Sequence, residues 1–194
     1  MPEPLTPDTI LDTAEGVLRR FGSAKSSVVD VARALGVSHG SVYRHFPSKA
    51  ALRDALLERW LARLEEPLEV ARSSQGSAVD RLSRWLYALA ASTQGMVRAD
   101  PELFATFQEQ TAELSDVVAA RIDRLTDQAA EIIAAGMAAG ELAPGDAAEV
   151  GRAVLRATAW FHHPALAAEW ADAGSADDLD DVVDLVLRGV VART

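Results

Sequence analysis

The sequence predicts an all-α protein, and three patterns in it indicate this fold class. Apolar residues recur every three or four positions along almost the whole chain, which is the spacing of one face of a helix. Serine, threonine or aspartate stands before most of these segments, and glycine or proline follows them, as at helix starts and ends. No stretch sustains the period-two alternation of a half-buried strand. We therefore expect helices throughout and no β-sheet.

The first predicted helix starts at Pro7 and ends at Gly22. Threonine followed by proline is a frequent helix start, because the N–H that proline lacks is not needed at the first helical position. The residues that share the apolar face are Ile10, Ala14, Val17, Leu18 and Phe21. A second, short helix begins with the capping-box pattern Ser27-x-x-Asp30 and stops at Gly36.

A third short helix and a long fourth one follow. Ser38 caps the third helix, which carries Val42 and Phe46 and ends at Pro47 because proline cannot continue a helix. Ser48 then caps the fourth helix, whose apolar stripe contains Leu52, Leu56, Leu57, Trp60, Leu61 and Leu64. The order of these four segments, three short and one long, predicts a small bundle followed by a connecting helix.

The remainder of the chain is separated from these segments by residues 73–77, which are rich in serine and glycine and predict a loop. Further helices are expected at about 79–89, in a short piece from residue 101, and at 114–133, 146–160 and 179–191. The signals that divide them are Gly136, Gly140, Pro144-Gly145, Asp146 and Pro164. No internal repeat is present, so a solenoid is excluded.

The composition excludes several classes of protein. With 49% hydrophobic residues in 194, the chain can bury a sizeable core. It contains no cysteine, which excludes a disulfide framework, a thiolate metal site and a cysteine nucleophile. The longest apolar run, residues 85–91, is too short to span a bilayer, and residues 1–4 do not resemble a signal peptide. We expect no membrane partner and a cytoplasmic location; the excess of arginine over lysine suggests a bacterial source.

The formal net charge of −10 is distributed unevenly along the chain. Residues 1–60 hold eight lysines and arginines and seven acidic residues, a net charge of +1, whereas residues 61–194 hold eleven and twenty-two, a net charge of −11. Attraction to DNA depends on the local patch of charge rather than on the whole chain. The charge therefore permits DNA binding by the first sixty residues and predicts weak non-specific affinity.

A helix-turn-helix is indicated by residues 26–49, which read SSVVDVARALGVSHGSVYRHFPSK. Few residues separate the two short helices, so the helices must cross steeply, and Ala32 and Val37 are small enough for that crossing. The second helix then carries mainly polar side chains outward. Serine, tyrosine, histidine and lysine can donate hydrogen bonds to phosphate, and arginine can reach base edges. The segment therefore predicts a DNA-binding element.

Residues 8–60 resemble the TetR/AcrR regulators. The usual pattern of that family, A-x-x-x-G-V-S followed by G-[ST]-[LV]-Y-x-H-F-x-x-K, is matched by ARALGVS at 32–38 and GSVYRHFPSK at 40–49. One departure is His39, where the family often has lysine. The resemblance implies a three-helix, helix-turn-helix DNA-binding domain at residues 1–48. A long helix would join it to an all-helical ligand-binding and dimerisation domain at residues 49–194.

The same resemblance implies nine DNA-binding residues. Those expected at backbone phosphates are Ser27, Ser38, Tyr43, His45 and Lys49. Those expected to face the major groove are His39, Gly40, Ser41 and Arg44. Val42 and Phe46 are expected in the core of the domain instead.

A group of aromatic and methionine residues in the second domain either lines a cavity or fills a core. The resemblance implies a cavity for a small-molecule effector, and the group is more numerous than a plain bundle needs. The predicted ligand-binding residues are Trp85, Leu86, Leu89, Met96, Phe104, Phe107, Trp160 and Phe161.

An apolar stripe in the last two predicted helices fits either an internal core or a two-fold partner, and the resemblance favours a dimer interface. The predicted interface residues are Val150, Val154, Ala157, Leu179, Val182, Val183, Val186, Leu187 and Val190. The acidic residues 177–184 complement the start of the final helix.

No motif in the sequence indicates catalysis or a cofactor. His162 and His163 are adjacent and therefore point to different sides of a helix, and no carboxylate follows at helical spacing, so a metal site is not expected. We expect this pair to end a helix or to line a pocket.

These patterns indicate a DNA-binding protein that is not an enzyme, and the resemblance implies a homodimeric, ligand-responsive repressor that binds a palindromic operator in double-stranded DNA. The alternative hypothesis is an all-helical small-molecule-binding protein or enzyme whose helix-turn-helix is incidental. The polar outer face of the third helix discriminates between them, because an enzyme has no use for it.

Overall fold

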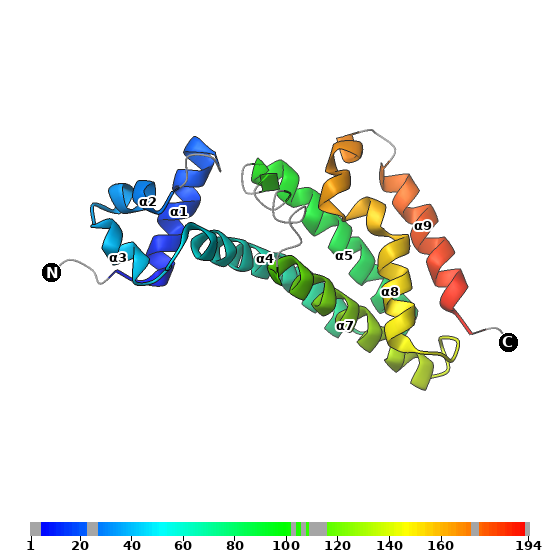
Figure 1. Cartoon of the computed structure of the whole chain (residues 1–194). Coiled ribbons are helices and arrows are strands. Elements are labelled where there is room, and N and C mark those ends of the chain that lie inside the picture. Colours follow the sequence, from blue (N-terminus) through cyan, green and yellow to red (C-terminus); the bar gives the residue numbers. More distant parts are fainter. Residues whose placement is uncertain are drawn as a thin grey trace.

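The computed structural model of the chain describes residues 5–22, 27–101, 104–105, 108, 116–171 and 175–192. These residues form helices without a strand, apart from one isolated bridge between Leu142 and Val191, so the predicted all-α class is confirmed. Figure 1 shows a small group of helices at one end, joined by one long helix to a larger bundle. None of the described helices is both long enough and apolar enough to cross a membrane.

The head of the molecule consists of α1 (Pro7–Phe21), α2 (Val28–Leu35), α3 (His39–Tyr43) and the start of α4 (Lys49–Ser73). All four helices begin where the sequence predicts, because side-chain oxygens of Thr6, Ser27, Ser38 and Ser48 each accept a backbone N–H of the first turn. The third helix ends at Tyr43, earlier than predicted. The chain instead turns there, with the N–H of Phe46 donating to the carbonyl of Val42 at 3.0 Å.

The head core joins all four of these helices. Its buried residues are Ile10, Leu11, Ala14, Val28, Val31, Ala32, Val42, Phe46, Leu52 and Leu56. Val31 and Val42 are fully buried, which fixes α2 and α3 against α1 and leaves the opposite side of α3 in solvent. Because Leu52 and Leu56 of α4 belong to the same cluster, the head core extends beyond residue 48; the predicted boundary between domains remains a prediction.

The body of the molecule is a bundle of α4 with α5 (Ala78–Ala99), α7 (Asp116–Ala138), α8 (Ala147–Ala157) and α9 (Ser175–Val190). Two 3₁₀ segments, η2 (Ala159–Phe161) and η3 (Pro164–Ala171), stand between α8 and α9. The sequence predicts helix up to Trp160, but the α-helix stops at Ala157. There the Thr158 hydroxyl donates to the carbonyl of Val154 at 3.0 Å, and the chain tightens into 3₁₀ turns ahead of Pro164.

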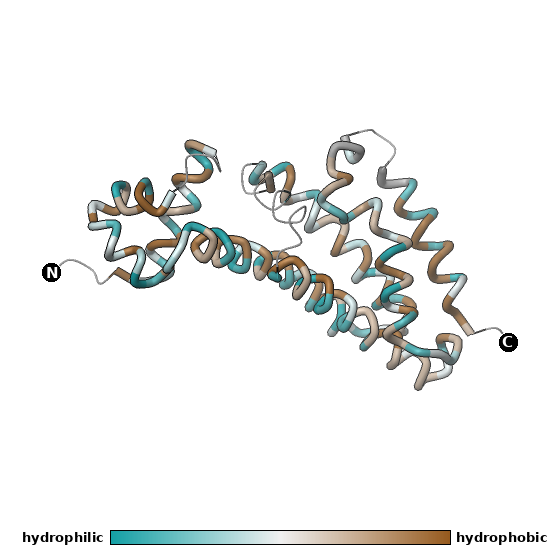
Figure 2. Tube along the Cα trace, viewed as in Figure 1, coloured by the Kyte–Doolittle hydropathy of each residue, from teal (hydrophilic) through white to brown (hydrophobic). Residues whose placement is uncertain are grey.

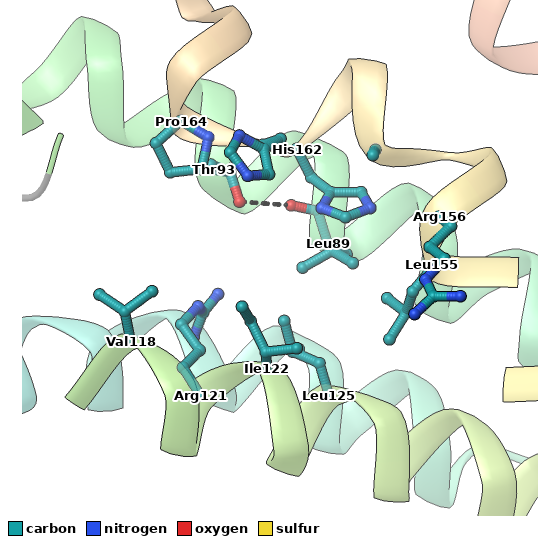
Figure 3. Close-up of a pocket in the computed structure, with 12 residues that line it drawn as sticks. Leu89, Thr93, Val118, Arg121, Ile122, Leu125, Leu155, Arg156, His162 and Pro164 are labelled. Carbon is teal, nitrogen blue, oxygen red and sulfur yellow. Dashed lines mark hydrogen bonds between the residues drawn. The ribbon is translucent and has the colours of Figure 1, made fainter. Parts of the chain in front are cut away.

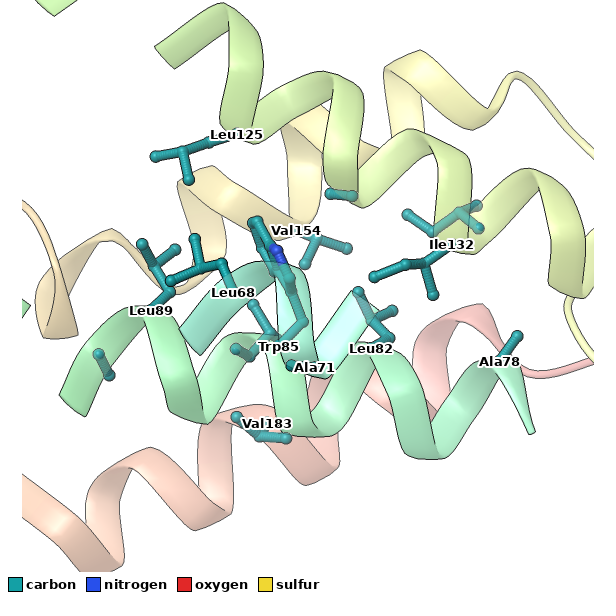
Figure 4. Close-up of a cluster of buried hydrophobic side chains, with 14 of the residues drawn as sticks. Leu68, Ala71, Ala78, Leu82, Trp85, Leu89, Leu125, Ile132, Val154 and Val183 are labelled. Atoms are coloured by element: carbon teal, nitrogen blue, oxygen red, sulfur yellow. The ribbon is translucent and has the colours of Figure 1, made fainter. Parts of the chain in front are cut away.

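The body core fills the space between these helices. Trp85, Leu82 and Ile132 are almost completely buried at its centre, and Val154 and Val183 close it from α8 and α9 (Figure 4). Brown, apolar segments of the chain trace alternate with teal, polar ones along the helices of the body (Figure 2). Each helix therefore has one apolar face turned inward, which is the pattern from which the helices were predicted.

A third cluster, the junction core, joins the head to the body. Its buried residues are Leu18, Leu57, Trp60, Leu61, Met96, Phe104 and Val118, which come from α1, α4, α5, the segment after α5, and α7. The long helix α4 thus contributes side chains to all three cores. Pro67 lies inside this helix and has no N–H, so the carbonyl of Arg63 one turn earlier receives no helical hydrogen bond from it.

Gly136, near the end of α7, allows a close approach of two other segments. A Cβ at this position would lie 2.6 Å from the Cβ of Ala78 and 2.7 Å from Cδ1 of Leu142, which real Cβ atoms do not tolerate. Gly140, two residues beyond the helix, has φ +74° and lets the chain turn back. This close packing fixes the start of α5 against the end of α7.

We predict that Gly136→Ala destabilises the protein by about 1–3 kcal/mol, because the added methyl group must displace its neighbours. Gly95→Ala is the matched control, since it lies inside α5 with nothing within 4 Å of the added Cβ. That variant should gain about 0.5–1 kcal/mol from helix propensity alone. Urea denaturation of both variants measures the difference. Equal stability of the two would contradict the close packing at Gly136.

Candidate functional site

A tight turn joins α2 to α3. Gly36 caps α2 in the left-handed conformation, with φ 68° and ψ 26°, and its N–H donates to the carbonyls of Ala32 and Arg33. The N–H of Val37 also donates to the carbonyl of Ala32, at 3.0 Å. Glycine is favoured here because a side chain at positive φ costs energy. The chain thereby reverses within three residues and begins α3 at the Ser38 cap, as a helix-turn-helix requires.

The outer face of α3 and the residues that follow it is polar. The predicted DNA-binding residues that are exposed are Ser38, His39, Gly40, Tyr43, Arg44, His45 and Lys49, whereas Ser27 and Ser41 are partly buried. The ring of His39 meets the ring of Tyr43 edge-on at 6.3 Å, and Tyr43 is 41% exposed. The tyrosine hydroxyl therefore stands at the surface beside the imidazole.

Three of the predicted DNA-binding residues, Ser27, Ser38 and Ser41, have hydroxyl groups that already form hydrogen bonds within the head. The Ser38 hydroxyl accepts the N–H of Ser41 at 3.2 Å and lies 2.9 Å from the Ser41 hydroxyl. The Ser27 hydroxyl donates to the carboxylate of Asp30 at 2.5 Å, and this hydrogen bond is the main reason that the pKa of Asp30 is lowered. A phosphate contact by the Ser27 hydroxyl would have to replace that bond.

Some cations of the head are paired with acids, and others among its described residues are not. Arg33 pairs with Asp30 at 3.1 Å, and Arg59 pairs with Asp12 and with Glu15. Within the part of the chain that the structure describes, Arg44 and Lys49 form no salt bridge; Arg44 makes only a 3.4 Å contact to the Ser41 hydroxyl. These two exposed cations flank the outer face of α3, where they are available to an anionic partner.

An ion cluster ties the head to the body next to the junction core. Arg19 of α1 donates from Nη2 to the carboxylate of Asp100, the residue that caps α5, at 2.7 Å, and from Nε at 3.0 Å. It also pairs with Glu15, whose carboxylate is 5% exposed and accepts from Arg63 of α4 at 2.6 Å. The bond to Asp100 raises the pKa of Arg19. The charges therefore link α1, α4 and the end of α5.

A cavity of about 280 Å³ lies in the body between α5, α7 and the segment from the end of α8 to η3. Its lining residues are Leu89, Thr93, Val118, Arg121, Ile122, Leu125, Leu155, Arg156, Ala159, His162, His163 and Pro164. Figure 3 shows Val118, Ile122 and Leu125 of α7 facing Leu89 and Thr93 of α5 across the space. The walls are largely apolar, and the polar residues among them are Thr93, Arg121, Arg156, His162 and His163.

Most of the predicted ligand-binding residues lie elsewhere. Only Leu89 is among the lining residues of this cavity. Trp85, Leu86 and Phe161 belong to the body core, Met96 and Phe104 belong to the junction core, Trp160 is 46% exposed, and Phe107 lies outside the described residues. The cores take the tryptophan, phenylalanine and methionine side chains of this group that are buried, whereas aliphatic, arginine and histidine side chains line the cavity. Helical periodicity does not distinguish the two positions, although the His162-His163 pair was a signal of a pocket.

A polar network runs from the cavity to α4. Arg121, 5% exposed, donates from Nη1 to the carboxylate of Glu65 at 2.7 Å, and Gln128 donates to the same carboxylate at 3.0 Å. The Trp85 Nε1–H in turn donates to the side-chain oxygen of Gln128 at 2.9 Å. Burial lowers the pKa of Arg121, and the neighbouring Glu65 carboxylate opposes that shift. Glu65 belongs to α4, so the cavity wall is bonded to the helix that carries the head.

The two adjacent histidines both line the cavity. Burial lowers the pKa of His162 to about 4, so its ring is neutral near pH 7, and its Nε2 lies 3.3 Å from the Thr158 hydroxyl. Nδ1 of His163 accepts the N–H of Ala165 at 3.2 Å. Among the described residues there is no cluster of side chains that could hold a metal ion.

The predicted dimer stripe is divided between the core and the surface. Val154, Leu179 and Val183 are buried in the body core, where they pack within their own chain, and their place in a dimer interface remains a prediction. Val150, Val182, Val186, Leu187 and Val190 are partly buried against the same core, and Ala157 is exposed. Leu185, which the sequence analysis did not single out, is 68% exposed on α9. Most residues of this apolar stripe thus pack in or against the core of their own chain.

Comparisons with known proteins agree with this architecture. Residues 10–56 match the family described as bacterial regulatory proteins, tetR family, and residues 78–183 match the tetracyclin repressor-like, C-terminal domain. The chain is 32% identical to an uncharacterized HTH-type transcriptional regulator of Mycobacterium tuberculosis, over 76% of this chain and 68% of that protein. It is 26% identical to the HTH-type transcriptional repressor KstR2 of Rhodococcus jostii, over 94% of this chain and 90% of that protein.

Solved structures share the fold over nearly the whole chain. A protein of unknown function from Rhodococcus sp. RHA1 superposes with a TM-score of 0.69 at 29% identity, covering 97% of both chains. SmeT, the repressor of the Stenotrophomonas maltophilia multidrug efflux pump SmeDEF, superposes with a TM-score of 0.66 at 20% identity, covering 96% of this chain and 91% of that one. A helix-turn-helix head on an all-helical body defines a transcriptional regulator. The chain belongs to the TetR family of these regulators.

We predict different effects of substitution at two neighbouring exposed residues of the head. Tyr43→Phe removes a hydroxyl expected at a phosphate, so it should weaken binding to specific and random duplexes alike. Arg44→Ala should instead relax preference at one base pair by about 1–3 kcal/mol, if the guanidinium reads a base. Gel shifts on both kinds of duplex measure this. Equal losses on all sequences for Arg44→Ala would make it a phosphate contact.

We also predict that His162 makes stability depend on pH. The unfolded chain protonates this ring near pH 6.5, whereas the folded protein keeps it neutral down to about pH 4. The unfolded state therefore binds more protons between these values, and stability falls as pH decreases, by about 2 kcal/mol from pH 8 to pH 5. Urea denaturation of wild type and His162→Gln should show a smaller loss in the variant. Parallel profiles would rule out a buried, neutral imidazole.

Proposed function

We propose that the protein is a ligand-responsive repressor whose head binds a palindromic operator and whose cavity binds the effector. The observation that carries this proposal is the separation of the two sites along α4: Leu52 and Leu56 build the head core, and Glu65 bonds the cavity wall. An effector that favours one position of this helix would change the spacing of the two heads of a dimer. Heads wrongly spaced for adjacent major grooves, about 34 Å apart, lose affinity.

The exposed face of α3 supports DNA as the partner of the head. Tyr43 and Arg44 at the end of α3 and Lys49 at the start of α4 are exposed, and the two cations have no acidic neighbour bonded to them among the described residues. The alternative function, a small-molecule-binding protein or enzyme with an incidental helix-turn-helix, leaves this polar face without a role. The cavity alone would suit either function. The exposed polar and cationic residues of the head favour the DNA-binding function.

The test of the proposed function uses purified full-length protein and sheared genomic DNA from its source organism. Captured fragments should be few, should share an inverted repeat, and should include the region upstream of the regulator's own gene. Expression of a reporter behind that region should rise when the regulator is deleted. Capture of all fragments equally, or a fall in reporter expression on deletion, would contradict a sequence-specific repressor.

We further predict a homodimer formed through residues 146–193. Leu185 is 68% exposed on α9, and in a partner contact Leu185→Asp would leave an unpaired carboxylate in an apolar interface. It is preferred to Val186→Asp, because Val186 also packs on the chain's own core. Light scattering at micromolar concentration should give twice the 20.7 kDa chain mass for wild type and a smaller mass for Leu185→Asp.

The control for the dimer is Val70→Asp, which places the same charge at a residue 65% exposed on α4. Its mass should equal that of wild type, because α4 is outside the proposed interface. A monomeric wild type, or dissociation of the control together with Leu185→Asp, would refute the proposed interface.

A further inference from the structure

The polar groups that line the cavity are mainly hydrogen-bond donors. Arg121 and Arg156 bring guanidinium N–H groups, and the ring of His163, whose Nδ1 accepts a backbone N–H, offers an N–H at Nε2. The hydroxyl of Thr93 already donates to a backbone carbonyl at 2.9 Å and can only accept from a ligand. No aspartate or glutamate is among the described residues of the lining. The cavity therefore favours an acceptor over a donor.

Arg121 is the most deeply buried of these donors. The residue is 5% exposed, and its guanidinium end turns from α7 toward the space opposite Leu89 and Thr93 (Figure 3). Glu65 receives a hydrogen bond from Nη1, whereas a guanidinium has five N–H groups in a fork that matches a carboxylate. Among the described residues Glu65 is the hydrogen-bond partner of this guanidinium, so the cation has donors left for a second anion.

We infer, building on the proposed function, that the effector is an apolar molecule with a carboxylate, and that this carboxylate binds Arg121 and weakens its ion pair with Glu65. The apolar walls formed by leucine, isoleucine and valine receive the hydrocarbon part. The buried guanidinium receives the charge, because charge-assisted hydrogen bonds of this kind are strong where water is excluded. A cationic molecule is disfavoured by the same residues, since two arginines line the cavity.

The effect on α4 follows from the balance of charge. Without a ligand, Arg121 and Glu65 form an ion pair in which the positive and the negative charge cancel. A second carboxylate leaves two negative charges on one cation at hydrogen-bond distance, and like charges at that distance repel. Glu65 lies two residues before Pro67, where α4 already lacks a backbone hydrogen bond. Loss of the Glu65 contact therefore acts close to the turn of α4 in which Pro67 removes a backbone hydrogen bond.

The first experiment measures binding to the full chain without DNA, by calorimetry at pH 7.5. The probes are octanoate and 4-phenylbutyrate, each with its matched alcohol and amine. In wild type, at least one carboxylate should bind about 10-fold to 100-fold more tightly than its alcohol, and its amine more weakly still. In Arg121→Gln, the carboxylate should fall to the affinity of its alcohol.

Two variants make this result specific. Arg124→Gln carries the same substitution three residues further along α7, at an exposed position that does not line the cavity, and should keep the preference for carboxylates. Because Arg121→Gln leaves Glu65 without its cationic partner and threatens the fold, the Glu65→Gln/Arg121→Gln double variant removes both charges. It too should bind the carboxylate no better than the alcohol.

Three outcomes would overturn the assignment. One is that no carboxylate in the panel binds, and another is that alcohols or amines bind wild type as tightly as the carboxylates. The third is a preference for carboxylates that survives Arg121→Gln, or one that is lost only in Arg156→Gln. Each is read without operator DNA, so failure here is distinct from failure of the protein to act as a repressor.

The second experiment tests the link to α4. The bound carboxylate should lower the affinity of wild type for its captured operator by about 10-fold or more. Glu65→Gln lacks the competing charge, so it should bind the carboxylate more tightly and show a smaller change in operator affinity. An equal response of Glu65→Gln and wild type would overturn the role of Glu65, even if Arg121 binds the carboxylate.

Discussion

The burial of a single helix, α4, in three separate cores is the constraint on which the rest of the molecule depends. Its first turns hold Leu52 and Leu56 in the head core, its middle places Trp60 in the junction core, and Leu68 lies in the body core. A helix is stiff along its axis because each turn is bonded to the next, so the three cores keep a fixed order along one rod. Head and body can change their relation only where this rod moves.

Ion pairs also connect α4 and the head to the helices of the body. The Arg19 contact to Asp100 and the Arg121 contact to Glu65 both join α-helices from different parts of the chain, and both involve a carboxylate or cation that is largely buried. Such pairs contribute little net stability, because removing the charges from water offsets most of their attraction. They do require a particular arrangement of helices, since moving one partner leaves the other buried without compensation. These ion pairs therefore determine how the helices are arranged, but they add little to the free energy of unfolding.

The sequence predicted the helices and the head well because these depend on local signals. Caps such as Ser27 and Ser48, and the left-handed Gly36, act within one turn of chain, so their effect is independent of distant residues. The cavity was not predicted residue by residue, because its lining depends on how α5, α7 and the chain after α8 meet. Trp85 has the same helical spacing whether it fills the core or lines a pocket. For Arg121, no sequence signal separates a buried cation from a solvated one.

The junction core also determines how this regulator can be recombined with its relatives. Leu18 of the head packs with Leu57 and Leu61 of α4 and with Met96 of the body, so no single cut in the sequence divides head from body without dividing a packed cluster. A hybrid with a foreign head fused at the start of α4 would combine side chains that did not evolve together. Engineered sensors of this type therefore have to carry the facing residues of α1 along with the body, and operator choice and effector choice are not freely interchangeable modules.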